Sequence, residues 1–256
     1  MSQDYKEKSI SLTCYTFMKT MKMKQSNSNS QISEIINNSQ IEIFPIDVVL
    51  IGATGAGKSS TLNALLGDTK AKIGNSFYPM TDKIKSYNFS DKLRFWDTPG
   101  VGDSYLSDIN HNLSIEMLLR TEAISGGQWL GLIDEVLLII DGSCKDLQSI
   151  TKLLNEIVGK NISPNRVLVA INKIDQALDG NNWNKRQNCP NDKLSAYLDE
   201  LLWQVEDRIY RSTGINIISP LCYSATEGYN IDKLSDYIIS NIPKEKREFF
   251  KTSSLR

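Results

Sequence analysis

The chain has few residues of the kinds that bind zinc, with four cysteines and one histidine among 256 residues. No two cysteines stand at metal-motif spacing, and His111 is the only histidine available to join them. A zinc site and a disulfide-stabilised secreted scaffold are therefore disfavoured. The pattern predicts reduced thiols in a cytoplasmic protein, at Cys14, Cys144, Cys189 and Cys222.

Long apolar runs are also missing. The longest, such as Val136 to Ile140, fall far below the roughly 18 residues that a membrane span needs. The segment Ile10 to Met18 is too polar for the apolar region of a secretory signal. We therefore expect no transmembrane segment and no signal peptide.

Charge of one sign is not in excess, because 29 lysines and arginines oppose 30 acids for a net charge of −1. This balance excludes a chain that coats nucleic acid through bulk charge, but not a local basic patch. The charge is unevenly distributed along the chain. Residues 45–242 are acidic overall, whereas basic residues outnumber acids at both ends. We expect residues 1–44 to be a flexible polar extension with a possible short helix, and residues 243–256 to be a basic C-terminal tail. Both ends are consistent with simple solvation or with contact to RNA or a membrane surface.

The body alternates short buried strands with amphipathic helices. Such alternation predicts an α/β fold with a mostly parallel sheet, helices on both faces, and ligands bound at the carboxyl ends of the strands. The strands are expected at Asp47–Ile51, Ile84–Phe89, Leu93–Trp96, Glu135–Ile140, Arg166–Ile171 and Asn216–Tyr223. The helices are expected at Lys58–Leu66, Leu147–Val158, Lys193–Tyr210 and Ile231–Ile242. The second and third strands, joined at Ser90-Asp91, have the pattern of a hairpin.

A glycine-rich loop follows the first strand and opens the first helix. It reads GATGAGKS, which matches G-x-x-x-x-G-K-[ST] in the context that confirms a phosphate-binding loop. Glycines allow backbone N–H groups to turn toward phosphate oxygens, and Lys58 supplies a positive charge. Ser59 is suited to hold Mg²⁺. The residues assigned to nucleotide binding here are Gly52, Thr54, Gly55, Ala56, Gly57, Lys58, Ser59 and Ser60.

Three further motifs stand at strand ends. In DTPG, Asp97 is a candidate for Mg²⁺ through water, and the N–H of Gly100 for the γ-phosphate. In NKID, the Asp175 carboxylate can accept two N–H bonds from guanine, a donor pair that adenine lacks. The remaining base contacts are assigned to Asn172, Lys173, Ser224, Ala225 and Thr226.

The order GATGAGKS, Thr81, DTPG, NKID and SAT resembles the translation-factor-class, Era-like P-loop GTPases. The strings GATGAGKSSTLNALLG, DTPGVGDS and GYNIDKL look like those of prophage-associated Era-like GTPases. The resemblance implies a three-layer G domain over residues 45–242, with a six-stranded mostly parallel sheet and one antiparallel edge hairpin. It also implies GTP or GDP and Mg²⁺ as ligands, with two switch loops.

The resemblance also assigns residues to the switch loops. Thr81 resembles the switch I threonine that binds Mg²⁺, while Val101 replaces the glutamine that orients water in Ras-like relatives. We therefore expect slow intrinsic hydrolysis, with Asp103 and His111 as candidates to supply the missing element from a mobile stretch. His111 is otherwise expected to be a solvated loop histidine. Gly55 stands where potassium-stimulated members carry asparagine, so no strong potassium activation is expected.

These motifs predict a Mg²⁺-dependent GTPase switch whose catalytic residues are Lys58, Thr81, Gly100 and Asp103. A nucleotide-gated interaction module with negligible hydrolysis remains open, as does, more remotely, an adenine-specific ATPase. The resemblance leaves the partner open between a ribosomal or other protein, RNA, a membrane surface and a GTP-dependent homodimer. The polar segment 176–192 is expected to be a solvated insertion, or else a contact surface.

Overall fold

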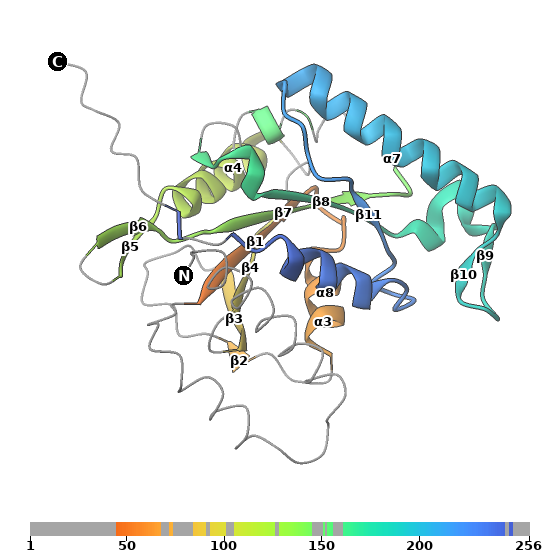
Figure 1. Cartoon of the computed structure of the whole chain (residues 1–256), viewed down its shortest axis with the longest axis horizontal. Coiled ribbons are helices and arrows are strands. Elements are labelled where there is room, and N and C mark those ends of the chain that lie inside the picture. The colour runs from red at the N-terminus through yellow and green to blue at the C-terminus, as the bar shows by residue number, and fades with distance from the viewer. Residues whose placement is uncertain are drawn as a thin grey trace, which may run out of the picture.

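A computed structural model gives the arrangement of the chain (Figure 1). It describes residues 45–67, 72–73, 84–90, 93–100, 105–125, 128–144, 151, 153–155, 161–243 and 246–247. The expected N-terminal extension, most of the expected helix 147–158 and most of the basic tail lie outside these residues.

Within the described residues, seven strands form the central sheet in the order β11-β8-β7-β1-β4-β3-β2. Neighbours from β11 to β4 pair in parallel, whereas β3 pairs antiparallel with both β4 and β2. The predicted mostly parallel sheet with an antiparallel edge is confirmed, and the seventh strand is the two-residue β2. The bounds are β1 (Ile46–Gly52), β2 (Lys72–Ile73), β3 (Lys85–Ser90), β4 (Leu93–Asp97), β7 (Glu135–Asp141), β8 (Val167–Asn172) and β11 (Leu221–Cys222).

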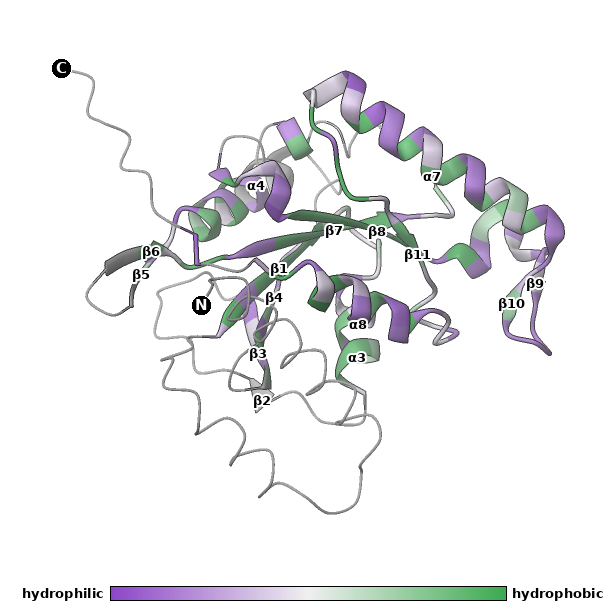
Figure 2. Ribbon diagram, in the orientation of Figure 1, coloured by the Kyte–Doolittle hydropathy of each residue, from purple (hydrophilic) through white to green (hydrophobic). Residues whose placement is uncertain are grey.

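Helices cover both faces of this sheet, as Figure 1 shows. On one face lie α4 (Tyr105–Leu119) and α7 (Asp192–Thr213), which pack on alternate side chains of β1, β7 and β8. On the other lie α3 (Lys58–Leu66) and α8 (Ile231–Ser240), which pack on the intervening side chains of the same strands. Because these three strands are buried on both sides, their sequences are continuous apolar runs, seen as green arrows in Figure 2.

Local signals set the helix ends. Helix α3 ends at Gly67 and α7 at Gly214, whose positive φ values of 61° and 71° suit glycine. The side chain of Asn191 caps the start of α7 by accepting the N–H of Leu194 at 2.9 Å. Among the helices in the described part of the chain, none has the length and apolar character to cross a membrane.

Two expectations about secondary structure are wrong. The expected strand Asn216–Tyr223 is reduced to β11, because Pro220 has no N–H to donate and pairing with β8 starts at Leu221. The stretch expected to be mobile after the DTPG motif contains α4, followed by a hairpin of β5 (Glu122–Ser125) and β6 (Gln128–Gly131). Helix α4 forms because Ile115, Leu118 and Leu119 bury an apolar face in the core.

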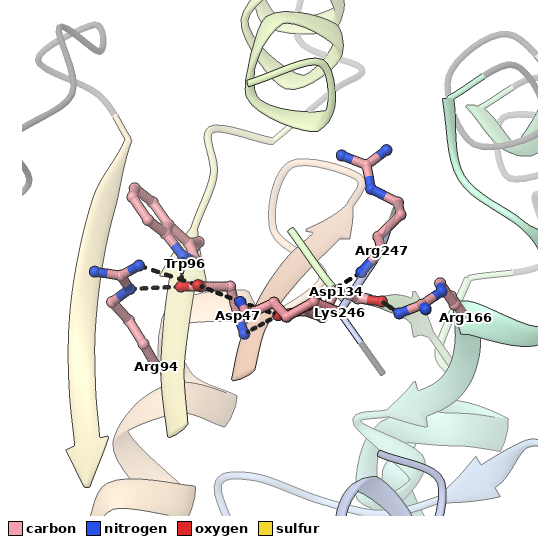
Figure 3. A network of polar contacts seen from close by, with 7 residues as sticks. All are labelled: Asp47, Arg94, Trp96, Asp134, Arg166, Lys246 and Arg247. Atoms are coloured by element: carbon pink, nitrogen blue, oxygen red, sulfur yellow. Dashed lines mark hydrogen bonds and ion pairs between the residues drawn. The ribbon is translucent and has the colours of Figure 1, made fainter. Parts of the chain in front are cut away.

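A network of charged side chains lies at the amino ends of the central strands (Figure 3). Asp47 at the start of β1 accepts Arg94 at 2.5 and 3.0 Å and the Trp96 indole N–H at 2.7 Å. Asp134, fully buried before β7, accepts the backbone N–H of Asp47 at 2.9 Å. The two acids therefore fix β1 and the entry to β7 relative to each other.

Two residues of the basic tail complete this network (Figure 3). The Lys246 ammonium lies 2.5 Å from Asp134 Oδ2 and 3.4 Å from Asp47 Oδ2. Arg247 is buried, and its guanidinium donates to the carbonyls of Leu119 and Asn161. The charges of Lys246 and Arg247 are thus paired within the body, whereas solvation or an outside contact was expected for the tail.

Replacement of the Lys246 charge should destabilise the fold. Lys246→Met should lower the free energy of unfolding by about 1–3 kcal/mol, because it leaves the buried Asp134 carboxylate with less compensation. Chemical denaturation measures this change. Lys193→Met, which replaces an exposed lysine of α7, is the control and should have little effect; equal effects of the two substitutions would contradict the role of the network.

Glu135 should make stability depend on pH. It is fully buried, and neither carboxylate oxygen has a hydrogen-bond partner in the described part of the chain. Burial, and then the nearby Asp134 charge, hold the pKa of Glu135 well above its ordinary value of 4.5. The folded state therefore binds a proton more tightly than the unfolded state, so this side chain costs stability as pH rises above 4.5.

Glu135→Gln removes this titration. The free energy of unfolding of the variant, relative to the unchanged protein, should increase as pH rises above 4.5 and level off once Glu135 ionises in the folded state. Urea denaturation at a series of pH values measures the difference. A difference that does not vary with pH would show that the Glu135 carboxyl titrates normally.

Candidate functional site

A cavity of about 450 Å³ opens at the carboxyl ends of β1 and β4, beside the start of α3. Predicted phosphate-loop residues line one side of it, and the DTPG motif lines the other. The lining residues are Thr54, Gly55, Gly57, Lys58, Ser59, Ser60, Asp97, Thr98, Pro99 and Gly100. The structure therefore brings together two motifs that are about forty residues apart in the sequence.

The backbone of the glycine-rich loop requires its glycines at two positions. Gly55 and Gly57 have φ values of 79° and 91°, in the region that L-residues rarely adopt. A Cβ on Gly57 would also lie only 2.3 Å from Nδ2 of Asn172. The loop therefore keeps a curved backbone against the first turn of α3, the arrangement in which N–H groups bind an anion.

The cavity is lined by one lysine and by a serine hydroxyl beside a carboxylate. Buried Lys58 donates to the carbonyls of Gly52 and Ala53 at 3.0 and 3.1 Å, so its ammonium lies at the loop. Ser59 Oγ donates to Asp97 Oδ2 at 2.7 Å, and Asp97 Oδ1 is buried without a partner among the described residues. A hydroxyl beside a carboxylate is a set of oxygen ligands that fits Mg²⁺.

The DTPG motif is fixed to both the sheet and the loop. Thr98 donates to the carbonyl of Leu50 at 2.7 Å, which ties the end of β4 to β1. A Cβ on Gly100 would lie 2.3 Å from Cα of Thr54, so this glycine is needed where the motif meets the loop.

The switch residues are described only in part. Thr81 and Asp103 lie outside the described residues, as does Val101. The expectation of a solvated loop histidine is wrong for His111, which is 8% exposed and lies in α4. Its Nδ1 is 2.6 Å from the Gly100 carbonyl oxygen, because the α4 backbone brings the ring back over the DTPG motif.

Asn172 links the two halves of the site. At the end of β8 its Nδ2 donates to the carbonyl of Ala56 in the phosphate loop at 2.9 Å. Its Oδ1 accepts the backbone N–H of Ala225 in the SAT segment at 3.0 Å. The N–H of Ala225, a residue assigned to the base contacts, thus bonds to Asn172 in this structure.

Lys173 and Asp141 form an ion pair at the carboxyl end of the sheet, and only Lys173 was predicted from the sequence. The Lys173 backbone is left-handed, and its ammonium lies 2.7 Å from Asp141 Oδ2 at the end of β7. Burial tends to raise the pKa of Asp141, but hydrogen bonds from Lys173 and Ser143 lower it below its ordinary value. Asp141 was not predicted, although its position at a strand end was a signal for it.

The Asp175 carboxylate has an oxygen that no described residue of the chain hydrogen-bonds. Asp175 is 9% exposed, and this oxygen, Oδ1, is buried. Ser224 is fully buried and accepts the N–H of Glu227 at 3.1 Å, whereas Thr226 is exposed. A buried carboxylate oxygen without a donor is costly unless a ligand supplies one.

The segment 176–192 is folded, which corrects the expected solvated insertion. It continues η3 (Ile174–Gly180) into a small hairpin of β9 (Trp183–Asn184) and β10 (Cys189–Pro190). Trp183 is buried and packs edge-on against Tyr229, with ring centroids 5.2 Å apart. Asn188 donates to the carbonyl of Glu227 at 2.8 Å, so the hairpin supports the loop that follows Ser224.

Comparison with known families agrees with this geometry. Residues 47–173 match the family described as 50S ribosome-binding GTPase, and over this segment the chain belongs to that family of P-loop GTPases. The match extends from the start of β1 through the lysine of the NKID motif.

Individual relatives are similar at modest identity. GTPase Der of Nautilia profundicola is 28% identical over 199 residues, which cover 76% of this chain and 36% of Der. Translocase of chloroplast 90 of Arabidopsis thaliana is 29% identical over 160 residues, 59% of this chain and 19% of that protein. The chain therefore spans well under half the length of these relatives.

A solved structure agrees in fold. Translation elongation factor SelB of Methanococcus maripaludis, in complex with the GTP analogue GppNHp, has a TM-score of 0.51 at 15% identity. The similarity covers 84% of this chain and 37% of SelB. The fold of this chain is the α/β G domain of such GTPases.

Loss of the Asn172 amide should weaken nucleotide binding. Asn172→Ala leaves the carbonyl of Ala56 and the N–H of Ala225 without this partner, at a cost of about 1–3 kcal/mol. We expect affinity for both GDP and GTP to fall roughly tenfold or more, since both halves of the site lose their link. Titration with labelled nucleotides measures this change.

Asn241→Ala is the matched control. Asn241 also donates to a carbonyl, that of Tyr237 at 2.7 Å, but at the end of α8. This variant should bind nucleotide normally. If Asn172→Ala retained full affinity as well, the proposed link would not contribute to binding.

Proposed function

We propose that the chain binds GTP with Mg²⁺ and hydrolyses it slowly to GDP and phosphate, as a molecular switch. The observation that carries this proposal is that Asn172 joins the cavity lined by the glycine-rich loop to the segment of Asp175, whose buried Oδ1 has no donor among the described residues. Membership of a GTPase family over residues 47–173 supports it.

Specificity for guanine rests on Asp175 in this proposal. Its carboxylate would accept the two N–H groups on one edge of guanine, and adenine would leave the buried oxygen unpaired. Lys173, held by Asp141, would lie along the base, and Ser224, Ala225 and Thr226 would close the other side.

Hydrolysis would depend mainly on placed charge. Lys58 and the loop N–H groups would neutralise the negative charge that the phosphates carry as the bond to the γ-phosphorus breaks. Ser59, Asp97 and Thr81 would hold Mg²⁺, which when bound stabilises charge on the β- and γ-phosphate oxygens. The Gly100 N–H would contact the γ-phosphate, and Asp103 stays a candidate for orienting the attacking water.

The identity of residue 101 favours a second candidate function. Valine has no polar atom to orient water, so hydrolysis without a partner should be slow. A nucleotide-gated interaction module with negligible hydrolysis would keep the same binding site. Turnover that stays negligible when partners are added would select this alternative.

The assignment within the family and the setting are also proposals. The DTPG and NKID strings support an Era-like member, with the prophage-associated type as the finer assignment. The family description supports a ribosomal partner in the cytoplasm. The similarity to a chloroplast translocase supports membrane association as the competing setting, and a GTP-dependent homodimer is a further possibility for the switch loops.

The experiment compares three proteins in nucleotide titration and phosphate release. The unchanged chain should bind GTP at micromolar concentration or below and release phosphate only with Mg²⁺. Lys58→Ala should lose turnover because the charge at the phosphates is gone. Asp175→Asn should lose GTP affinity by about 100-fold or more and gain affinity for xanthosine triphosphate, whose C2 carbonyl accepts an amide N–H.

The outcomes distinguish between the proposed functions. If Asp175→Asn leaves GTP binding intact, Asp175 does not recognise the base. Tighter binding of ATP than of GTP by the unchanged chain would favour an adenine-specific ATPase. If the unchanged chain binds neither GDP nor GTP, the proposed function is wrong.

A further inference from the structure

Gly100 is fixed from one side by the phosphate loop. It lines the cavity, and the space where a side chain would begin is occupied by the Thr54 backbone and hydroxyl. Gly100 and Thr54 are therefore in such close backbone contact that neither can move toward the other.

His111 fixes the same residue from the other side. Its Nδ1 lies 2.6 Å from the Gly100 carbonyl oxygen, and a carbonyl can only accept, so Nδ1 carries the hydrogen. This bond restrains the Gly100 carbonyl, and through the Cα of the same residue it limits how far the Gly100 N–H can turn. A histidine side chain from α4 therefore holds the last residue of the DTPG motif.

The ring is held by a rigid element. His111 lies one helical turn before Ile115 in α4, and Ile115, Leu118 and Leu119 are 0–1% exposed in the core beneath. The imidazole is itself buried, so its hydrogen bond does not compete with bulk water. A displacement of Gly100 therefore either breaks this bond or moves α4.

We propose that His111 is a positioning residue for the γ-phosphate contact and couples the presence of that phosphate to α4. The inference rests on the proposed function, in which the Gly100 N–H meets the γ-phosphate. His111 acts through the Gly100 carbonyl and not on the attacking water, because its Nδ1 is bound to that carbonyl. GDP has no γ-phosphate, so the contact of the Gly100 N–H would form with GTP and not with GDP.

The test uses substitutions that separate ring shape from hydrogen bonding. His111→Phe keeps the ring but removes the donor, while His111→Asn places an amide nitrogen where Nδ1 stands. The measurements are single-turnover GTP hydrolysis and the dissociation constants of GDP and of a non-hydrolysable GTP analogue, all with full-length protein.

His111→Phe should slow hydrolysis by about 3- to 10-fold and weaken the analogue relative to GDP by a similar factor. Its GDP affinity should match that of the unchanged chain. His111→Asn should recover most of both losses, a rescue that a purely structural role of the ring would not give. If the phenylalanine variant does not fold, His111→Leu carries the same expectation.

Leu113→Ala is the control on the same helix. Leu113 is 51% exposed, so its truncation should alter neither hydrolysis nor the ratio of the two affinities. The inference is overturned if His111→Phe weakens GDP and the analogue equally, if it changes neither, or if His111→Asn fails to rescue. Absence of GTP binding in the unchanged chain would instead overturn the proposed function, so the two failures are distinguishable.

Discussion

The two hydrogen bonds of the Asn172 side chain are the interaction on which the site depends. One reaches the carbonyl of Ala56 in the phosphate loop and the other the N–H of Ala225 beside the base segment. These segments follow different strands, β1 and β11, and β8 carries Asn172 between them in the chain. Gly57 has no side chain, and a Cβ there would collide with this amide. The spacing between the predicted phosphate and base positions is therefore set by one asparagine.

The opposite ends of the strands are fixed by charge. Asp47 and Asp134 hold Arg94, Trp96 and Lys246 where β1 and β7 begin. This network is costly to desolvate, and it is stable only because almost every oxygen in it has a donor. Charged side chains hold the starts of the strands, and Asn172 holds the segments at their carboxyl ends, so we expect the sheet to be rigid. Motion on nucleotide exchange is then expected in the segments attached to the sheet, such as Gly100 and α4.

Much of this architecture was predictable from local sequence. The strands β1, β7 and β8 are rich in consecutive apolar residues, Gly67 ends α3 with a positive φ that suits glycine, and Asn191 begins α7 by capping it with its side chain. The phosphate loop was predictable because its glycines, lysine and serine stand at fixed spacing between a strand and a helix. In contrast, Asp134 and Lys246 are 112 positions apart, so nothing local announced their pairing. The burial of Trp183 and His111 was missed for the same reason, since polar neighbours in the sequence hide contacts made across the fold.

Guanine recognition is the central claim, and calorimetric titration of the unchanged chain with GDP and with ADP tests it most directly. The account predicts that GDP binds at micromolar concentration or below, because the Asp175 oxygen and the cavity gain partners together. ADP, which leaves that oxygen unpaired, should bind at least about 100-fold more weakly. Equal affinities for the two nucleotides, or no binding of GDP, would contradict it.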